Sequence, residues 1–251
     1  MTTWVLLRGL GREARHWGDL PQRLRAELPG TRVLAIDLPG NGRAWCKPSP
    51  SRVPGMVDAV RDELRLRGEA GPFVVLALSL GGMVAMEWAV RHPGELRACV
   101  LVNSSASGFS RPWQRLRPGA WPLLLPWLLP RASLPARELA VYRVTSNLPV
   151  RAAVLDDWIA IALSRPVSPR NLARQLLAAA RYRAPARLPV PALVLASAGD
   201  RLVSPRASEA IAEAWGAPLR THPGAGHDLP LDDPEWVVRQ AVDWVRQRPP
   251  A

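Results

Sequence analysis

Ser79 stands where a strand of apolar residues, 73–78, runs directly into an apolar helical stretch, 80–90. In Ala77-Leu78-Ser79-Leu80-Gly81 the residues two places to either side of the serine are small. A sharp strand-to-helix turn forces its corner residue into strained backbone geometry, and larger side chains two places to either side would then clash. The turn lifts the hydroxyl clear of the sheet at a helix N-terminus, where N–H groups favour developing negative charge. The pattern predicts that Ser79 is a nucleophile.

A serine hydroxyl needs a base within hydrogen-bond reach, which a third group orients. The chain has four histidines, and three of them fit structural roles. His92 lies at a helix C-terminus, His222 at a strand end, and His16 beside an aromatic residue. His227 differs, because it follows a strand and a Gly-Ala-Gly turn that could place it above the carboxyl edge of a sheet. His227 is therefore the predicted base.

Asp200 ends the strand that precedes the His227 loop, in Ala198-Gly199-Asp200. The chain order Ser79, Asp200, His227 is one of the known orders for a nucleophile, an orienting acid and a base. We expect Asp200 to hold the imidazole in the tautomer that accepts the serine proton.

Short apolar runs that alternate with helical stretches predict βαβ units and an α/β fold with a mainly parallel sheet. The carboxyl ends of such strands share one edge, where the three side chains could meet. The expected strands are 3–7, 32–36, 73–78, 98–102, 191–197 and 218–222, and the expected helices 17–28, 56–66, 80–90, 205–215 and 234–245.

Residues 108–188 differ in character, because strand-like runs vanish and Trp, Leu, Pro and Arg dominate. We interpret this segment as a helical cap (lid) inserted into an α/β core of residues 1–107 and 189–251. The apolar residues of the cap suggest a hydrophobic pocket for an acyl group.

The net charge of +12 is concentrated in the cap segment. Residues 108–190 contain Glu138, Asp156 and Asp157 against a much larger number of arginines. Arginine is almost the only basic residue, Lys47 being the single lysine, so codon bias toward GC-rich codons explains part of the charge. The arginines are at positions 111, 115, 117, 131, 137, 143, 151, 165, 170, 174, 181, 183 and 187.

Three interpretations of this basic segment stay open. It is a solvated helical face, a docking site for an acidic acyl carrier protein, or a loose attachment to anionic membrane. Trp113, Trp121, Trp127 and the apolar run 121–130 would anchor a membrane contact, which we do not favour. No nucleic-acid-binding motif accompanies the charge, so we expect no nucleic acid partner.

Cys46 and Cys99 are far apart and lack metal-ligand spacing, so we expect two reduced thiols, with Cys99 in the core. The first ten residues are too short and too soon interrupted by Arg8 for a signal peptide. The longest apolar stretch, 121–130, is shorter than the about twenty residues of a spanning helix. The expected location is cytoplasmic.

Taken together, these residues resemble the α/β-hydrolase superfamily, and within it the small capped carboxylesterases of the pimeloyl-carrier-protein methyl ester esterase type. The resemblance rests on these segments: Leu7-Arg8-Gly9-Leu10-Gly11, Trp17, Asp37-Leu38-Pro39-Gly40, Leu78-Ser79-Leu80-Gly81-Gly82, Gly199-Asp200 and Gly226-His227. It implies an oxyanion hole, next to the substrate, made by the backbone N–H groups of Leu10 and Leu80. It implies no cofactor and no metal.

Two features depart from that family. Arg8-Gly9 replaces its usual His-Gly, and the chain begins at the first parallel strand, so its leading antiparallel strands are expected to be absent or vestigial. Serine at position 79, where aspartate would be needed, argues against the haloalkane dehalogenase and epoxide hydrolase branches.

The sequence thus predicts a serine hydrolase that cleaves a carboxylic ester, or a thioester or carrier-bound acyl ester, through an acyl-enzyme. A small apolar acyl ester is the expected substrate. The alternatives are a carbon–carbon bond hydrolase or perhydrolase with the same triad, and a non-catalytic ligand-binding homologue.

Overall fold

A six-stranded parallel sheet forms the centre of the computed structural model, which describes residues 2–122 and 132–248. The strand order is β2-β1-β3-β4-β5-β6, so the chain starts inside the sheet and moves outward in both directions. The α/β fold class with a mainly parallel sheet is confirmed. The strands are β1 (Thr3–Leu7), β2 (Arg32–Ile36), β3 (Phe73–Leu78), β4 (Leu96–Val102), β5 (Ala192–Ser197) and β6 (Leu219–His222).

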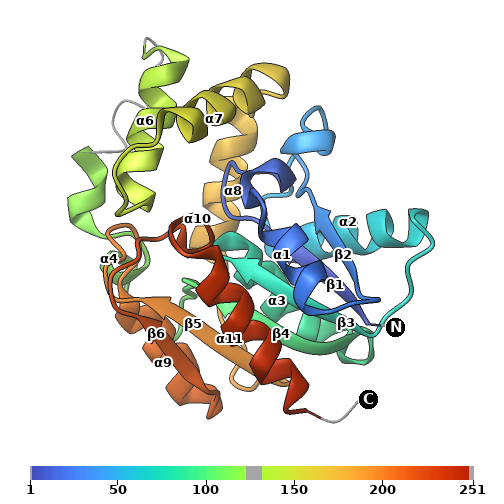
Figure 1. The fold of residues 1–251 in the computed structure, drawn as a ribbon. Helices are drawn as coiled ribbons and strands as arrows, with labels where there is room; N and C mark the ends of the chain where they lie inside the picture. Colours follow the sequence, from blue (N-terminus) through green and yellow to red (C-terminus); the bar gives the residue numbers. More distant parts are fainter. Residues whose placement is uncertain (1, 123–131, 249–251) are drawn as a thin grey trace.

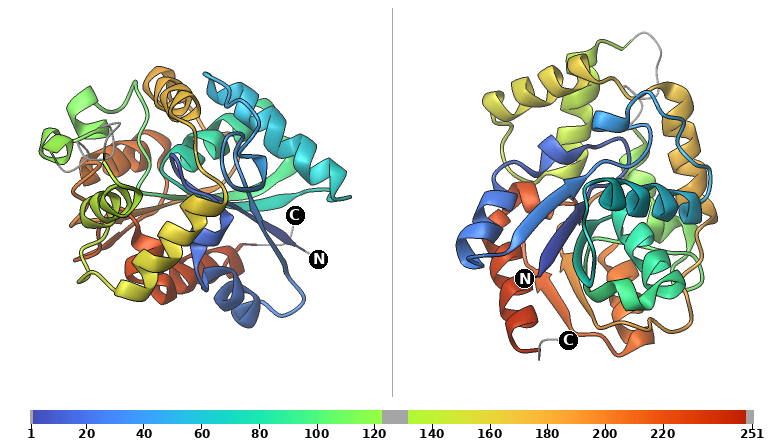
Figure 2. Two further views of the ribbon diagram at one scale, coloured as in Figure 1. Left: turned by 90° about the horizontal axis from the view of Figure 1, so that it is seen from above. Right: turned by 90° about the vertical axis from the view of Figure 1, so that its right-hand side faces the viewer.

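Helices cover both faces of this sheet, as Figures 1 and 2 show. Every expected strand and helix of the core is present, with ends that differ from the predicted ones by a few residues. The helices are α1 (Leu20–Glu27), α2 (Val53–Leu66), α3 (Leu80–Arg91), α4 (Pro112–Arg115), α6 (Leu134–Thr145), α7 (Ala152–Ser164), α8 (Pro169–Arg181), α9 (Pro205–Trp215), α10 (Leu229–Asp232) and α11 (Pro234–Arg246).

The core has two layers, because successive side chains of a strand point to opposite faces. In β1, Val5 and Leu7 belong to the core layer that also contains residues of α2, α3 and α9, whereas Trp4 and Leu6 belong to the layer that contains residues of α1 and α11. The strands β1 and β3 are buried along their whole length. Burial on both faces explains why they are continuous apolar runs in the sequence.

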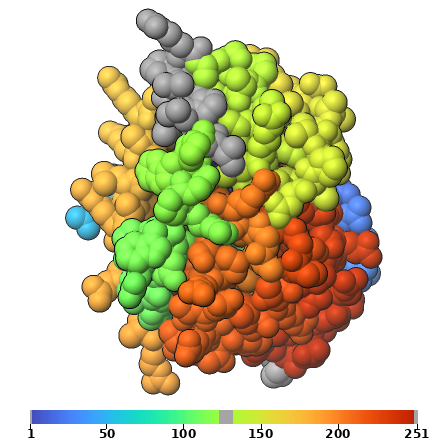
Figure 3. Space-filling model, turned by 90° about the vertical axis from the view of Figure 1, so that its left-hand side faces the viewer, coloured from blue at the N-terminus to red at the C-terminus, as the bar shows by residue number. Residues whose placement is uncertain are grey.

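The residues between β4 and β5 (103–191), called the insertion below, contain α4, α6, α7 and α8. Figure 1 shows α6 and α7 above the carboxyl edge of the sheet. In the space-filling view the green segment around α4 lies against orange residues that follow the insertion (Figure 3). Two backbone hydrogen bonds join these segments, from Ser204 N to Gln114 O and from Arg117 N to Leu202 O. The predicted cap limits of 108 and 188 stay a prediction.

In the described part of the chain no helix is long and apolar enough to cross a membrane. Most of the apolar run 121–130, with Trp127, and also Arg131, lie outside the described residues.

Candidate active site

Ser79 occupies the corner between β3 and α3 with a positive φ of 56° and a ψ of −116°. L-residues other than glycine rarely adopt such a backbone, and at functional sites it marks stored strain. Gly81 meets the requirement for a small residue, because a Cβ there would lie 2.4 Å from the carbonyl oxygen of Leu7. A Cβ on Gly82 would collide with the hydroxyl of Ser104. The corner therefore needs glycine at both positions.

The loop after β1 passes directly beside the serine. A Cβ built on Gly9 would lie 3.2 Å from Ser79 Cβ and 3.7 Å from Ser79 Oγ. Leu10 follows Gly9, and Leu80 is the first residue of α3, so its N–H has no acceptor within the helix. Leu10 and Leu80 both line the cavity that contains Ser79. The two predicted oxyanion donors are thus placed next to the serine.

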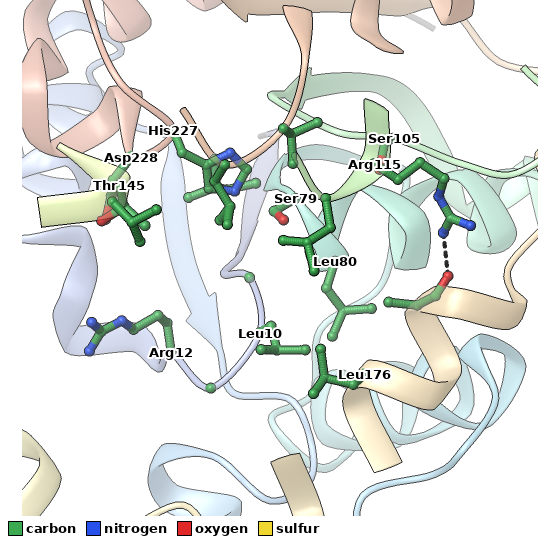
Figure 4. A pocket seen from close by; sticks show the side chains of 18 of the residues that line it. Leu10, Arg12, Ser79, Leu80, Ser105, Arg115, Thr145, Leu176, His227 and Asp228 are labelled. Carbon is green, nitrogen blue, oxygen red and sulfur yellow. Dashed lines mark hydrogen bonds between the residues drawn. The ribbon is translucent and has the colours of Figure 1, made fainter. Parts of the chain in front are cut away.

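His227 and Asp200 are in direct contact, with 2.7 Å between His227 Nδ1 and Asp200 Oδ2. Both are buried, with 4% and 1% of their surface exposed. The other carboxylate oxygen of Asp200 accepts hydrogen bonds from the backbone N–H groups of Leu202 and Val203, each at 2.8 Å. A carboxylate accepts only, so Nδ1 carries a proton and Nε2 is left as the acceptor. Figure 4 shows His227 and Ser79 at the same cavity.

Asn103, just after β4, fixes the backbone of the histidine loop. Its Nδ2 donates to the carbonyl oxygens of His227 at 2.8 Å and Gly226 at 3.3 Å. Its Oδ1 accepts from Ser197 N at 2.9 Å. Asn103 has a φ of 43°, a left-handed conformation that asparagine adopts more readily than most residues. The side chain therefore links the ends of β4 and β5 to the loop of the predicted base.

Arg8 and Asp228 form a buried ion pair at the edge of the cavity. Arg8 Nη1 lies 2.9 Å from Asp228 Oδ1, and Arg8 Nη2 lies 2.5 Å from Asp228 Oδ2. The two side chains are only 3% and 4% exposed, and the guanidinium lies 4.9 Å from the centre of the Trp17 ring. Arg8 precedes Gly9 and Leu10 in the loop after β1, and Asp228 follows His227. The pair therefore joins the loop after β1 to the loop that carries His227.

Hydrogen bonds join the insertion to the loops that carry Asp200 and His227. Asn147 donates from Nδ2 to the carbonyl oxygens of Gly199 and Gly224, both at 2.9 Å. Asp228 N donates to Thr145 O at 2.7 Å. Fully buried Gln175, on α8, accepts from the N–H of Gly11, in the loop after β1, at 2.9 Å.

The cavity at these residues encloses about 440 Å³ and is mainly apolar. Its polar lining includes Ser79, His227 and Ser105, as well as charged side chains from both the core and the insertion. The apolar lining residues are Leu10, Leu78, Leu80, Met83, Pro112, Leu116, Val141, Val144, Leu176, Ala179, Ala180, Leu202 and Val203.

The other histidines lie elsewhere. His16 is buried against Trp158, with ring centres 5.6 Å apart, and burial holds its pKa well below the usual 6.5. His222 accepts backbone hydrogen bonds from Gly224 and Ala225. Within residues 2–122 and 132–248 no three His, Cys, Asp or Glu side chains are grouped closely enough to hold a metal ion.

Sequence reasoning did not identify Asn103 or Asp228 as parts of this site, and it noted Arg8 only as a departure from the family pattern. For Asn103 a signal existed, since a polar residue follows an apolar strand at the predicted functional edge. The Arg8–Asp228 pair joins residues 220 positions apart, and no local pattern reveals such a pairing.

Comparison with known proteins places the whole fold in one family. The profile of the alpha/beta hydrolase family matches residues 4–240. A thermophilic esterase from Thermogutta terrifontis superimposes with a TM-score of 0.76 over 98% of this chain and 90% of that chain, at 24% identity.

Curated relatives match over a shorter part of the sequence. A pimeloyl-[acyl-carrier protein] methyl ester esterase of Neisseria meningitidis serogroup C is 37% identical over 101 residues, 40% of this chain and 36% of that protein. The protein of the same name from Aromatoleum aromaticum is 36% identical over 121 residues, 47% of this chain and 42% of that protein. The matches thus span less than half the length of these relatives.

Proposed function

Since this chain belongs to the alpha/beta hydrolase family, we propose that it is a serine hydrolase that cleaves carboxylic esters through an acyl-enzyme. The contact between His227 and Asp200, at the cavity that also holds Ser79, carries this proposal. The names of the curated relatives support an ester substrate. The site needs no metal or cofactor for the steps below.

Ser79 Oγ attacks the ester carbonyl, and His227 Nε2 takes the hydroxyl proton. Asp200, which accepts from Nδ1, stabilises the imidazolium that forms. The carbonyl electrons move to oxygen, where the N–H groups of Leu10 and Leu80 donate to the oxyanion. One such donor contributes roughly 3–4 kcal/mol to stabilising the transition state.

Collapse of this intermediate breaks the ester C–O bond, and the imidazolium returns its proton to the departing alcohol. A water molecule then attacks the acyl-enzyme with His227 as the base again. The second collapse releases the carboxylic acid and restores the Ser79 hydroxyl. The apolar cavity would hold the acyl chain, and the insertion would act as the cap over it.

A fluorophosphonate probe followed by peptide mass spectrometry tests the nucleophile. We expect the label on Ser79 and none after Ser79→Ala, and Ser79→Ala should lower kcat on a short p-nitrophenyl ester by about 10³-fold or more. Ser105→Ala is the matched control, because Ser105 is the other serine on the cavity wall, and it should still label. Label on Ser105, or wild-type turnover by Ser79→Ala, would refute the assignment.

We also propose that the exposed arginines of the insertion receive an acidic carrier protein bearing the acyl ester. Arg170, Arg174 and Arg181 are exposed on α8, which contributes Leu176 and Ala179 to the cavity wall. A basic surface next to the cavity would attract an acidic partner and bring its acyl chain to the site.

Charge reversal tests this docking. The triple variant Arg170→Glu, Arg174→Glu, Arg181→Glu should raise KM for a carrier-protein-bound ester by about tenfold or more, with a small p-nitrophenyl ester as the reference. Because the effect is electrostatic, it should shrink as salt is added. An equal loss on both substrates would contradict docking.

A further inference from the structure

The described side chains on the cavity wall carry more positive than negative charges. Among the described residues the lining contains the arginines Arg8, Arg12 and Arg115, but only the carboxylates Glu138 and Asp228. Arg8 is paired with Asp228. Arg12 is paired with Glu138 at 2.6 Å. Arg115 therefore leaves an excess of one positive charge in a mainly apolar cavity.

Arg115 is held in place by neutral groups only. Its Nη1 donates to Ala180 O at 3.1 Å and its Nη2 donates to Ala179 O, both in the last turn of α8. Within the described part of the chain no carboxylate is within ion-pair distance of Arg115. Its Nε is buried and has no hydrogen-bond partner there. Burial lowers the pKa of Arg115, so the protein around it does not compensate the charge fully.

The position of Arg115 separates it from the other two arginines. Figure 4 shows Arg115 reaching toward a carbonyl of α8 on one side of Ser79, while Arg12 lies on the opposite side of the view. Leu116, which follows Arg115 in the sequence, and Ala179, whose carbonyl oxygen accepts from Arg115, are apolar residues of the cavity wall. Half-buried Arg115, without a carboxylate partner on a mainly apolar wall, favours a planar anion, because its planar guanidinium can donate charge-assisted hydrogen bonds to both oxygens of a carboxylate.

We propose that Arg115 is a specificity residue that binds one carboxylate group of the substrate, remote from the scissile ester. The substrate class is then an ester that carries a single negative charge, for example a half-ester of a dicarboxylic acid. This inference rests on the proposed ester hydrolysis and concerns free esters, whose carboxylate is not joined to a carrier protein. A single carboxylate neutralises the one positive charge that the described carboxylates of the cavity wall leave unpaired.

The test compares charged and neutral esters of equal length. Monomethyl dicarboxylates of increasing chain length are measured beside the matching methyl alkanoates, and acetyl esters of ω-hydroxy acids place the carboxylate on the alcohol side instead. In at least one series the wild type should prefer the charged ester in kcat/KM by about tenfold to a hundredfold. Arg115→Gln should abolish that ratio, and Arg115→Lys should retain part of it.

Arg111→Gln is the matched control, because it removes the same charge from an exposed residue of the same segment outside the cavity lining. It should keep the wild-type ratio. If Arg111→Gln lowers the ratio as much as Arg115→Gln, general surface attraction explains the preference and the proposal is wrong. An equal fall in both esters in Arg115→Gln, or no preference at any chain length in the wild type, also overturns it.

A binding measurement separates failure of this inference from failure of the proposed function. In Ser79→Ala, calorimetry should show the half-ester bound about tenfold or more tightly than the neutral ester, and addition of Arg115→Gln should remove the difference. If the wild type hydrolyses no ester, the proposed function fails, yet this binding difference still decides the role of Arg115. Equal binding of both esters refutes it.

Discussion

Replacement of Arg8 by methionine would leave the carboxylate of Asp228 buried without its partner. The two side chains are 3% and 4% exposed and share two hydrogen bonds, so the full cost of an unpaired buried charge applies. Removal of one partner of such a pair costs about 3–5 kcal/mol. Arg8→Met and Asp228→Leu should each lose this much of a total stability of about 5–15 kcal/mol.

The double variant Arg8→Met, Asp228→Leu removes both charges and leaves apolar groups that can pack against Trp17. Buried ion pairs replaced in this way are often neutral in stability. We therefore expect the double variant within about 2 kcal/mol of the wild type, and a coupling energy of about 3 kcal/mol or more.

Urea unfolding of all four proteins, followed by circular dichroism, measures this coupling. Each single variant should shift the midpoint down by about 1–2 M, and the double variant by less than either. Strictly additive losses would show that the two charges do not interact. Losses below about 1 kcal/mol in each single variant would show that the pair is solvated, as surface ion pairs are.

Three other predictions concern single positions. Gly81→Ala should abolish activity and lower Tm, because a Cβ would lie 2.4 Å from a main-chain carbonyl oxygen of β1. Burial raises the pKa of the Cys99 thiol to about 12, so a thiol reagent at neutral pH should modify exposed Cys46 in the native protein and both cysteines in urea. A hydrogen bond from Arg61 lowers the pKa of Glu95 from 4.5 to about 2. The ionised Glu95 carboxylate therefore stabilises the fold above pH about 4.5, and this stabilisation is lost as the pH falls through about 2. The stability difference between wild type and Glu95→Gln, measured by thermal unfolding, should shrink over that pH window, and a difference that stays constant would contradict this.

The core strands could be predicted because a strand that is buried on both faces is apolar at every position, as in 73–78. The corner at Ser79 could also be predicted, because the turn has no room for a side chain at Gly81, two residues further along the chain. Membership of the family is confirmed by the match over residues 4–240. These features depend on neighbours in the sequence.

Contacts between segments far apart in the chain could not be predicted from the sequence. Glu138 and Arg12 form an ion pair on the cavity wall, but neither periodicity nor spacing relates an insertion residue to the loop after β1. The fastening of Asn147 to two glycine carbonyls is likewise a product of the tertiary fold. The catalytic roles of Ser79, Asp200 and His227 stay predictions, although Asp200 contacts His227 and both His227 and Ser79 line one cavity.

The attachment of residues 145–147 has a consequence for chimeric hydrolases built by grafting. Gly199 and Gly226 have no room for a side chain, because Asn147 and Thr145 lie against them. A donor insertion spliced at the ends of β4 and β5 would replace Asn147 and Thr145 with foreign residues. The loops of Gly199 and Gly226 would then lose their contacts with the insertion at the same time. Recombination that keeps residues 145–147 with the recipient scaffold, and exchanges only the helices beyond, should preserve the positions of Asp200 and His227.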